Sequence, residues 1–444
     1  MSFPEYQAVM RKHGAKGDLM LHQQHGPVFT VAHTPFVSDP EAVKAILMVK
    51  ANTEKRHPMY KTVTYLTSPA IYGVMHMDGE PWKKHTRALA SAFHESNVLP
   101  YIGAMVTAVR VHSDARLASG GHGDDLVYTM RGVSADVVMA WAFGLNPTAE
   151  RTQQLLAHMR ELDALVADQT SAVLAAVDPP LRSKGNPIWQ LYEAWRLDRK
   201  QRPMVRNILQ GLKDGEKGLG VEGGSGVNMI LRLEEAGVPL FEISREVGHV
   251  YGAHKASGLV LAAGLYTLAR HSPTRSTADS EWANIIREEA ERVLQGRPIA
   301  GRSDVEALTS IHLVMNEVLR LHPVALVSLR WTAEAIQCGE VTIPAGPVVV
   351  SLHALLNDPG VWGEDAATFN PRRFEAKAPR NSFVPFLAGK RMCNGMPLAR
   401  MEFAVMITTF LMHYDIVCME DIELAGSGYT VFQRPVPFKV VRRS

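Results

Sequence analysis

Hydrophobic positions along the chain recur mostly at the three- and four-residue spacing of helices that bury one face. The segments with this spacing are residues 40–50, 81–93, several stretches between 101 and 175, 188–212, 244–270, 309–321 and 398–412. Asp39 precedes the first of them and Pro40 takes its first position, which favours a capped helix start. The pattern predicts a protein made mainly of α-helices.

Apolar runs of strand length are few. GPVFTV covers residues 26–31, and LVSLRWT and VTIPAGPVVV cover residues 326–332 and 341–350. Their β-branched residues are typical of short strands. Since no internal repeat and no change of composition marks a boundary, we expect one domain, residues 1–444, mainly α with small β-sheets.

The composition is ordinary for a globular protein: 46% of the 444 residues are hydrophobic, 21% are charged, and the formal net charge is +2. So small a net charge argues against binding nucleic acid. The longest apolar runs, such as the one from Leu259, reach about half of the ~20 residues that span a bilayer. The N-terminus carries no apolar stretch of signal type. We therefore expect a cytoplasmic protein with no membrane anchor.

Cys393 lies in an unusual loop, PFLAGKRMCNGMP, which runs from Pro385 to Pro397. The chain has only two other cysteines and no CxxC pair, which argues against a disulfide framework and a zinc site. A single thiolate is what a haem iron needs, because the porphyrin supplies the other four donors. The predicted helix that follows would stabilise the negative charge of the sulfur with its N-terminal amides. A buried structural cysteine in an ordinary loop is the alternative.

FLAGKRMCNG resembles the haem-binding signature of the cytochromes P-450, Phe-x-x-Gly-x-Arg-x-Cys-x-Gly, at every defined position. The resemblance extends over most of the chain. NEVLRLHP carries the family's Glu-x-x-Arg pair, here Glu317 and Arg320, and FNPRRF carries Arg373, which joins that pair in a buried ion network in relatives. The resemblance implies the cytochrome P-450 fold, with the haem between the long distal helix and the helix after the cysteine loop.

The resemblance also implies which residues bind haem b, that is, iron protoporphyrin IX. Cys393 would be the ligand of the metal. The other expected cofactor contacts are Trp82, Arg330, Phe386, Gly389, Arg391 and Gly395. The arginines and the tryptophan would meet the propionates, and the glycines would let the backbone turn close to the macrocycle. Where relatives often have Arg or His, four residues after the tryptophan, this chain has Thr86, and Arg87 or His85 is the expected substitute.

The longest predicted helix resembles the one that crosses the distal face of the haem in this family. Relatives carry small residues there, followed by an acid and an alcohol that deliver protons to bound dioxygen. Here GAHKAS keeps the small residues Gly252 and Ala253, but Lys255 and Ala256 replace the acid and the alcohol, and Ser257 follows one residue late. These five residues are the candidate catalytic residues.

Lys255 has two interpretations. It either reaches solvent or an acid elsewhere, or it anchors an anionic group such as a substrate carboxylate. His249 and His254 are weaker candidates for a proton donor, because a lone histidine is more often structural.

The activity that the resemblance implies first is monooxygenation of a small, largely apolar organic substrate, with electrons from a separate ferredoxin or flavodoxin and its reductase. Lys83, Lys84 and Arg87, with Lys390 and Arg400, would form a basic face on which such a partner docks. The altered helix leaves two alternatives open. One is a haem-thiolate enzyme that uses peroxide or rearranges its substrate, and the other is a haem-binding sensor without turnover.

Overall fold

The computed structural model describes residues 1–48, 73–143, 157, 187–213, 229–338, 340–425, 431–432 and 434–443. Most of the helical pattern predicted between residues 144 and 175 lies outside this part of the chain. Within it, helices dominate and the sheets are small, so the predicted fold class is confirmed.

Contacts within the chain divide it into two compact units, and each unit combines separate stretches of sequence. Unit 1 comprises Met1–His57, Met105–Ser134 and Ala256–Ser444, and unit 2 comprises Pro58–Ala104 and Ala135–Lys255. The organisation as one domain over residues 1–444 stays a prediction.

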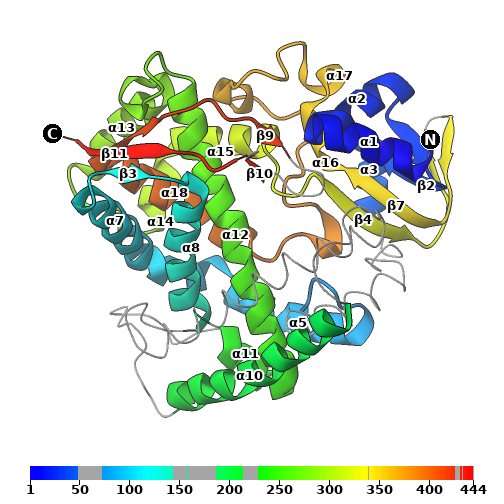
Figure 1. Cartoon of the computed structure of the whole chain (residues 1–444), viewed down its shortest axis with the longest axis horizontal. Coiled ribbons are helices and arrows are strands. Elements are labelled where there is room, and N and C mark those ends of the chain that lie inside the picture. The colour runs from blue at the N-terminus through cyan, green and yellow to red at the C-terminus, as the bar shows by residue number, and fades with distance from the viewer. Residues whose placement is uncertain are drawn as a thin grey trace. The chain divides into compact units, whose positions relative to one another are not determined.

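The main sheet of unit 1 has four strands in the order β1-β2-β7-β4. β1 (Val28–Val31) and β2 (Thr34–Val37) form an antiparallel hairpin, β2 runs parallel to β7 (Gly346–Ser351), and β7 pairs antiparallel with β4 (Val327–Thr332). Three helices lie beside this sheet in Figure 1, namely α1 (Phe3–His13), α2 (Ala15–His25) and α3 (Pro40–Met48). The predicted cap of α3 is confirmed, because Ala42 N donates to Asp39 Oδ1 at 2.7 Å.

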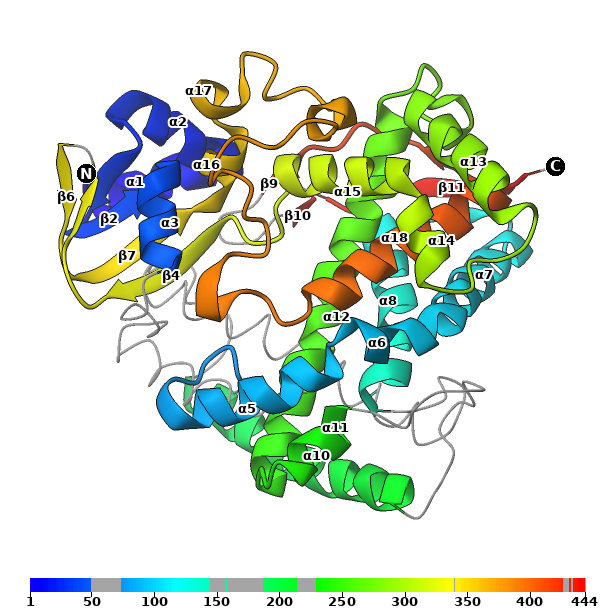
Figure 2. The ribbon, with the colours of Figure 1, turned by 180° about the vertical axis from the view of Figure 1, so that it is seen from behind.

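Among the remaining helices of unit 1, α13, α14 and α15 pack against α18, whereas α16 contacts α2 and α17, as Figure 2 shows from behind. α18 is apolar on all sides and almost wholly buried, which is typical of a helix in the middle of a core. The bounds of these helices are α7 (Ile102–Ala118), α13 (Glu281–Leu294), α14 (Arg302–Ala307), α15 (Thr309–Leu321), α16 (Leu352–Asn357), α17 (Pro359–Trp362) and α18 (Met396–His413). Single 3₁₀ turns are η5 (Thr277–Asp279), η6 (Pro371–Phe374) and η7 (Gly389–Arg391).

The other strands of unit 1 form one three-stranded sheet and two small ladders. The sheet has the order β3-β11-β8, and the ladders join β5 to β6 and β9 to β10. Their bounds are β3 (His122–Gly123), β5 (Ile336–Cys338), β6 (Val341–Ile343), β8 (Tyr414–Cys418), β9 (Leu424–Ala425), β10 (Val431–Phe432) and β11 (Phe438–Arg442).

All the regular elements in the described part of unit 2 are helices. Its helices are α5 (Gly79–Ala92), α6 (Glu95–Val98), η3 (Leu99–Tyr101), α10 (Pro187–Lys213) and α11 (Met229–Glu235), while α8 (Leu126–Phe143) and α12 (Leu240–Arg270) belong to both units. α12 begins at Leu240 rather than at the predicted Ser244, because Pro239 sets the first turn. None of the described helices combines the length and the apolar character needed to cross a bilayer.

Candidate functional site

The cysteine loop is a tight turn of unit 1 that ends at the start of α18. Cys393 N donates to Phe386 O at 2.9 Å, which closes the turn. Leu387 and Gly389 both adopt left-handed backbone conformations, with φ of 63° and 69°. At Gly389 the conformation and the packing both demand glycine, since a Cβ there would lie 2.2 Å from the carbonyl oxygen of Leu47 in α3.

The loop presents the Cys393 side chain in an exposed position, whereas Cys418 is buried. α18 begins at Met396, so the positive end of its helix dipole lies close to the thiol in sequence and favours the thiolate. Gly395, the residue before this helix, has a φ of −78°, which any residue can adopt. In the part of the chain that the structure describes, no three His, Cys, Asp or Glu side chains converge as a metal site.

Two of the predicted cofactor arginines are buried in unit 1. Arg391, in η7, is 8% exposed, and Arg330, in β4, is 3% exposed. Arg330 Nη1 donates to Ser328 Oγ at 2.7 Å and to Leu329 O at 2.8 Å. Both acceptors are neutral, so these two contacts orient the guanidinium without cancelling its charge. The planar guanidinium group of an arginine is well suited to bind a carboxylate.

Phe386 is half-buried, and the guanidinium carbon of Arg400 lies 5.6 Å from the centre of its ring. Arg400 Nη1 also donates to Asn316 Oδ1 at 3.4 Å, and burial lowers the pKa of Arg400. Arg400 therefore packs against Phe386 and Asn316 within unit 1.

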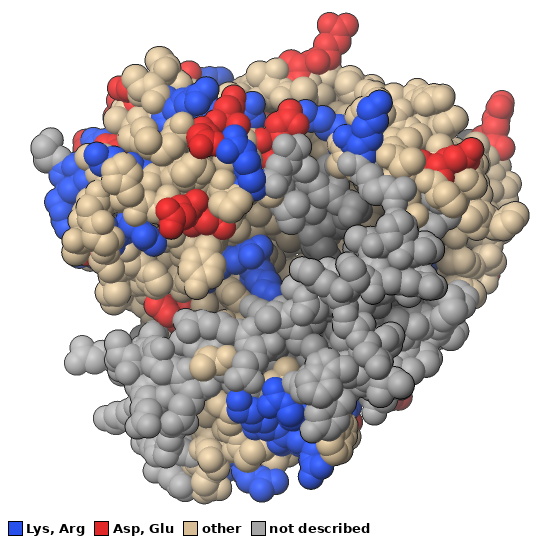
Figure 3. All heavy atoms as spheres, in the orientation of Figure 1, with Lys and Arg blue, Asp and Glu red and all other residues tan. Residues whose placement is uncertain are grey.

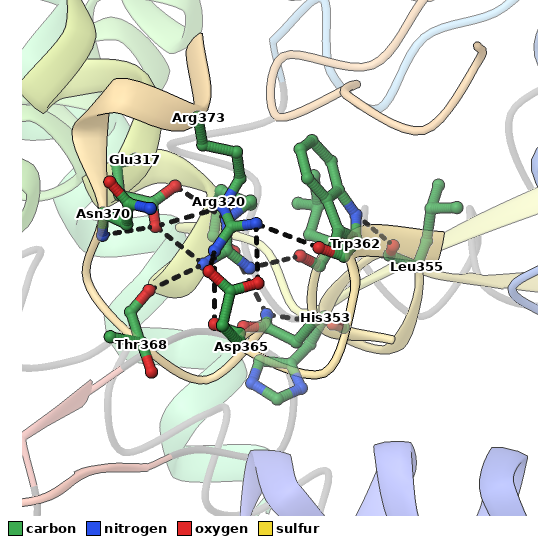
Figure 4. Close-up of polar contacts among 11 residues, drawn as sticks. Glu317, Arg320, His353, Leu355, Trp362, Asp365, Thr368, Asn370 and Arg373 are labelled. Carbon is green, nitrogen blue, oxygen red and sulfur yellow. Dashed lines mark hydrogen bonds and ion pairs between the residues drawn. The ribbon is translucent and has the colours of Figure 1, made fainter. Parts of the chain in front are cut away.

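Glu317, Arg320 and Arg373 meet as the sequence predicted, and Figure 4 shows their contacts. Arg320 Nε and Nη2 each donate to an oxygen of Glu317 at 2.8 Å, and both side chains are completely buried. Arg373 Nε lies 3.6 Å from Glu317 Oε1, and Arg373 Nη2 donates to Asp365 Oδ2 at 2.8 Å. Arg320 also donates to the carbonyl oxygen of Leu356 at 3.0 Å. The network therefore fixes η6 and the end of α16 to α15.

The five candidate catalytic residues follow one another on α12. Gly252, Lys255, Ala256 and Ser257 are half-buried, and Ala253 is exposed. A Cβ added at Gly252 would meet no heavy atom within 4 Å, so the small residue leaves open space beside the helix.

Ser257 interacts with an acid that α12 itself does not supply. Glu402, on α18, is 1% exposed and accepts a hydrogen bond from Ser134 Oγ at 3.2 Å. Burial raises the pKa of Glu402 to about 7, although hydrogen bonds from Ser257 and Ser134 act in the opposite direction. Glu402 was not predicted from the sequence. The signal that could have found it is an acid directly before the apolar run FAVMITTF, which begins at Phe403.

α5 of unit 2 carries Trp82, which is half-buried, and His85, which is completely buried. His85 Nε2 lies 2.9 Å from Glu242 Oε2, and His85 Nδ1 lies 3.1 Å from Glu246 Oε2. The expectation that His85 substitutes for the missing propionate contact is therefore wrong, because two carboxylates of α12 already bind its ring. Arg87 is exposed on the same helix and stays the remaining candidate.

The basic residues of α5 are on its surface. Lys83, Lys84 and Arg87 are exposed, and Lys84 Nζ donates to the carbonyl oxygen of Gly237 at 2.7 Å. On the face drawn in Figure 3, Lys and Arg mix with Asp and Glu in the upper part, whereas the group of charged residues in the lower part is Lys and Arg.

The sequence as a whole matches the model of the family described as Cytochrome P-450 over residues 5–441. The chain belongs to the cytochrome P-450 family. The resemblance found in the cysteine loop and the ion network is thereby confirmed for the whole chain, and the fold is that of the family.

Plant proteins are among the similar relatives. Cytochrome P-450 734A5 from Oryza sativa subsp. japonica is 26% identical over 414 residues, which are 88% of this chain and 74% of the relative. 7-deoxyloganic acid hydroxylase from Catharanthus roseus is 26% identical over 85% of this chain and 74% of its own length. Cytokinin hydroxylase from Arabidopsis thaliana is 25% identical over 79% of this chain and 67% of its own length.

This chain is a cytochrome P-450-type monooxygenase, and its family implies a haem iron cofactor, an organic substrate and a redox partner. The residues of unit 1 fit a haem. They offer one exposed soft donor at the start of a helix and two buried arginines suited to carboxylates.

Proposed function

We propose that Cys393 Sγ would bind the iron of haem b, and that Arg330 and Arg391 would bind its propionates. The exposed thiol at the start of α18 is the observation that carries this proposal. When bound, the haem supplies the iron at which oxygen is activated. The hydrogen bond from Cys393 N to Phe386 O would hold the thiolate in place. The dipole of α18 would stabilise its negative charge. The corresponding roles of Trp82 and Gly395 rest on the resemblance alone.

The proposed substrate is a small, largely apolar organic molecule that carries a carboxylate, with Lys255 as the anchor of that group. Lys255 is half-buried on α12, three residues after Gly252, where the helix leaves open space. An ammonium group held partly out of water favours an anion more strongly than an exposed one does. The name of one relative, 7-deoxyloganic acid hydroxylase, is that of an enzyme acting on an acid, which supports the same substrate class here.

A spectral binding screen tests the anchor. Small aromatic and alicyclic acids are titrated into the haem-loaded protein beside their methyl esters, and the shift of the haem absorption gives the Kd. We expect Lys255→Ala to weaken binding of the acids by about 10- to 100-fold, as loss of a hydrogen bond to a charged group does, and to leave the esters unchanged. Lys439→Ala, an exposed lysine of β11, is the control. Equal Kd values for the acids in the wild type and Lys255→Ala would contradict the anchor.

The electrons are proposed to come from a separate ferredoxin or flavodoxin and its reductase. The exposed row of Lys83, Lys84 and Arg87 on α5 supports this proposal, because an acidic partner is steered by such a face.

The replacement of the acid and the alcohol by Lys255 and Ala256 favours one second candidate, an enzyme that uses hydrogen peroxide. Acids that bind in the screen are incubated with hydrogen peroxide alone, and in parallel with reductant, ferredoxin and oxygen. Product from peroxide alone supports the second candidate, and product only with reductant and oxygen supports the first. An acid that binds but gives no product in either mixture would support the third hypothesis, a haem-binding sensor without turnover.

A further inference from the structure

Glu246 is the centre of a buried polar network in unit 2. It is fully buried and accepts three hydrogen bonds, from His85 Nδ1 at 3.1 Å, from His249 Nδ1 at 2.8 Å and from Val74 N at 2.8 Å. Burial alone would raise the pKa of Glu246, but the hydrogen bonds and charges of His249 and then His85 lower it to about 2. Glu246 is therefore a carboxylate throughout the neutral pH range.

His85 holds that carboxylate in place from α5. Both of its ring nitrogens face carboxylate oxygens, those of Glu242 and Glu246, and an ionised carboxylate only accepts hydrogen bonds. Both nitrogens must then carry hydrogen, so His85 is an imidazolium. Burial lowers the pKa of His85, but the bonds to Glu246 and Glu242 outweigh it, and the net direction is upward.

His249 is the second histidine bound to Glu246, and its environment differs from that of His254. Since His249 Nδ1 donates to Glu246 Oε1, the other nitrogen, Nε2, is the one that exchanges protons. The side chain is 20% exposed, and the His76 ring lies 6.0 Å away. His254 is 5% exposed and binds the carbonyl oxygen of Tyr251 on its own helix.

The network lies on the side of α12 that continues to the small residues. Glu242, Glu246, His249 and Ala253 are separated by four, three and four positions, so they share one face of the helix. The backbone of the helix rises by ~6 Å from His249 to Ala253, so a proton passing between these positions would travel through a water.

We propose that His249 is a proton donor that replaces the missing acid and alcohol, and that Glu246 is its positioning residue. This inference rests on the proposed function, because it requires oxygen to be activated beside Gly252 and Ala253. Protonated His249 would release the proton of Nε2 to a water beside Ala253, and that water would pass a proton on to the oxygen being reduced there. The neutral ring keeps its Nδ1 hydrogen on Glu246 and takes a new proton at Nε2 from water. One proton passes in each cycle, and no electron moves through the network.

Oxygen consumption without substrate tests this role. NADPH, a ferredoxin and its reductase supply two electrons, and two protons complete the conversion of dioxygen to hydrogen peroxide. We expect His249→Gln to lower the rate at least tenfold, the lower range of general acid catalysis, while the haem content is unchanged. We expect Glu246→Gln to lower the rate, because His249 loses the group that positions it, and Glu246→Asp to restore part of the rate. His254→Gln, the matched control on α12, should stay within twofold of the wild type.

Histidine NMR on the intact protein gives a readout that does not depend on turnover. Glu246→Gln should lower the pKa of His85, because one of the two carboxylates that raise it is gone. An unchanged His85 titration would overturn the network itself. A rate for His249→Gln within twofold of the wild type would overturn the proton donor. A wild type that consumes no oxygen would instead contradict the proposed use of oxygen and reductant, and with it this inference.

Discussion

Gly389 is the residue of the cysteine loop whose identity the backbone dictates most directly. Its φ of 69° disfavours any side chain, and a Cβ would collide with the carbonyl oxygen of Leu47. We expect Gly389→Ala to lower the free energy of unfolding by at least about 2 kcal/mol in urea denaturation. Gly395→Ala, in the same loop at a φ of −78°, should cost less than about 1 kcal/mol. Equal losses in the two variants would contradict this account.

The buried ion network gives a second contrast between single residues. Glu317→Ala leaves Arg320, which is 0% exposed, without its bidentate carboxylate. We expect a loss of about 3–5 kcal/mol in the free energy of unfolding, as for other broken buried pairs. Arg373→Ala should cost about 1 kcal/mol, because its other carboxylate, Asp365, is half-exposed. Thermal unfolding of the two variants measures the difference. A smaller loss of stability for Glu317→Ala than for Arg373→Ala would contradict a buried pair of Glu317 and Arg320 at the centre of the network.

At the scale of elements, the burial of Glu402 on α18 sets a pH dependence. The pKa of Glu402 is about 7 in the folded protein, above its ordinary value of 4.5. Between pH 4.5 and about 7 the folded state therefore binds more protons than the unfolded state. The free energy of unfolding falls as the pH rises through this range, and the loss is complete above pH 7.

Glu402→Gln should remove this fall. Above the folded pKa of Glu402, the variant should be more stable than the wild type by up to about 3 kcal/mol, measured by urea denaturation over a pH series. Glu289→Gln is the control, because hydrogen bonds from Ser310 and Thr309 lower the pKa of Glu289 against the effect of burial. A wild type whose stability is constant between pH 4.5 and 7 would contradict the buried protonated acid.

Periodicity in the sequence located single elements well and contacts between them poorly. α15 was predicted at Thr309–Leu321, where the structure has it, because its apolar face is strongly one-sided. α1 and α2 were missed, although Ser2 and Glu5 form a capping box in which Ser2 N donates to Glu5 Oε2 at 2.7 Å. The partners of Ser257 and His85 could not be predicted, because they come from helices far away in the sequence.

At the scale of the whole molecule, the family and its activity were predicted from motifs and not from composition. The cysteine loop and the ion network identified the family, and the match over residues 5–441 confirmed it. The net charge of +2 conceals a local basic row on α5. The cytoplasmic location and the single domain stay predictions.

That basic row predicts how a partner binds. Lys83→Glu together with Arg87→Glu should raise the Kd for an acidic ferredoxin at least tenfold at low ionic strength, because two attractive charges become repulsive. The effect should shrink as salt is added. Lys439→Glu on β11 is the control for the change in net charge. Surface plasmon resonance at two salt concentrations measures the Kd of each variant. An equal rise in Kd for Lys439→Glu and for the double variant would contradict a docking face on α5.

The most direct test of the central claim is the absorption spectrum of the reduced protein under carbon monoxide. A haem bound through Cys393 should give the red-shifted Soret band from which the cytochromes P-450 take their name. Cys393→Ser should abolish the band, while Cys338→Ser and Cys418→Ser keep it. The same band in Cys393→Ser, or its absence from the haem-loaded wild type, would contradict the thiolate ligand on which the account depends.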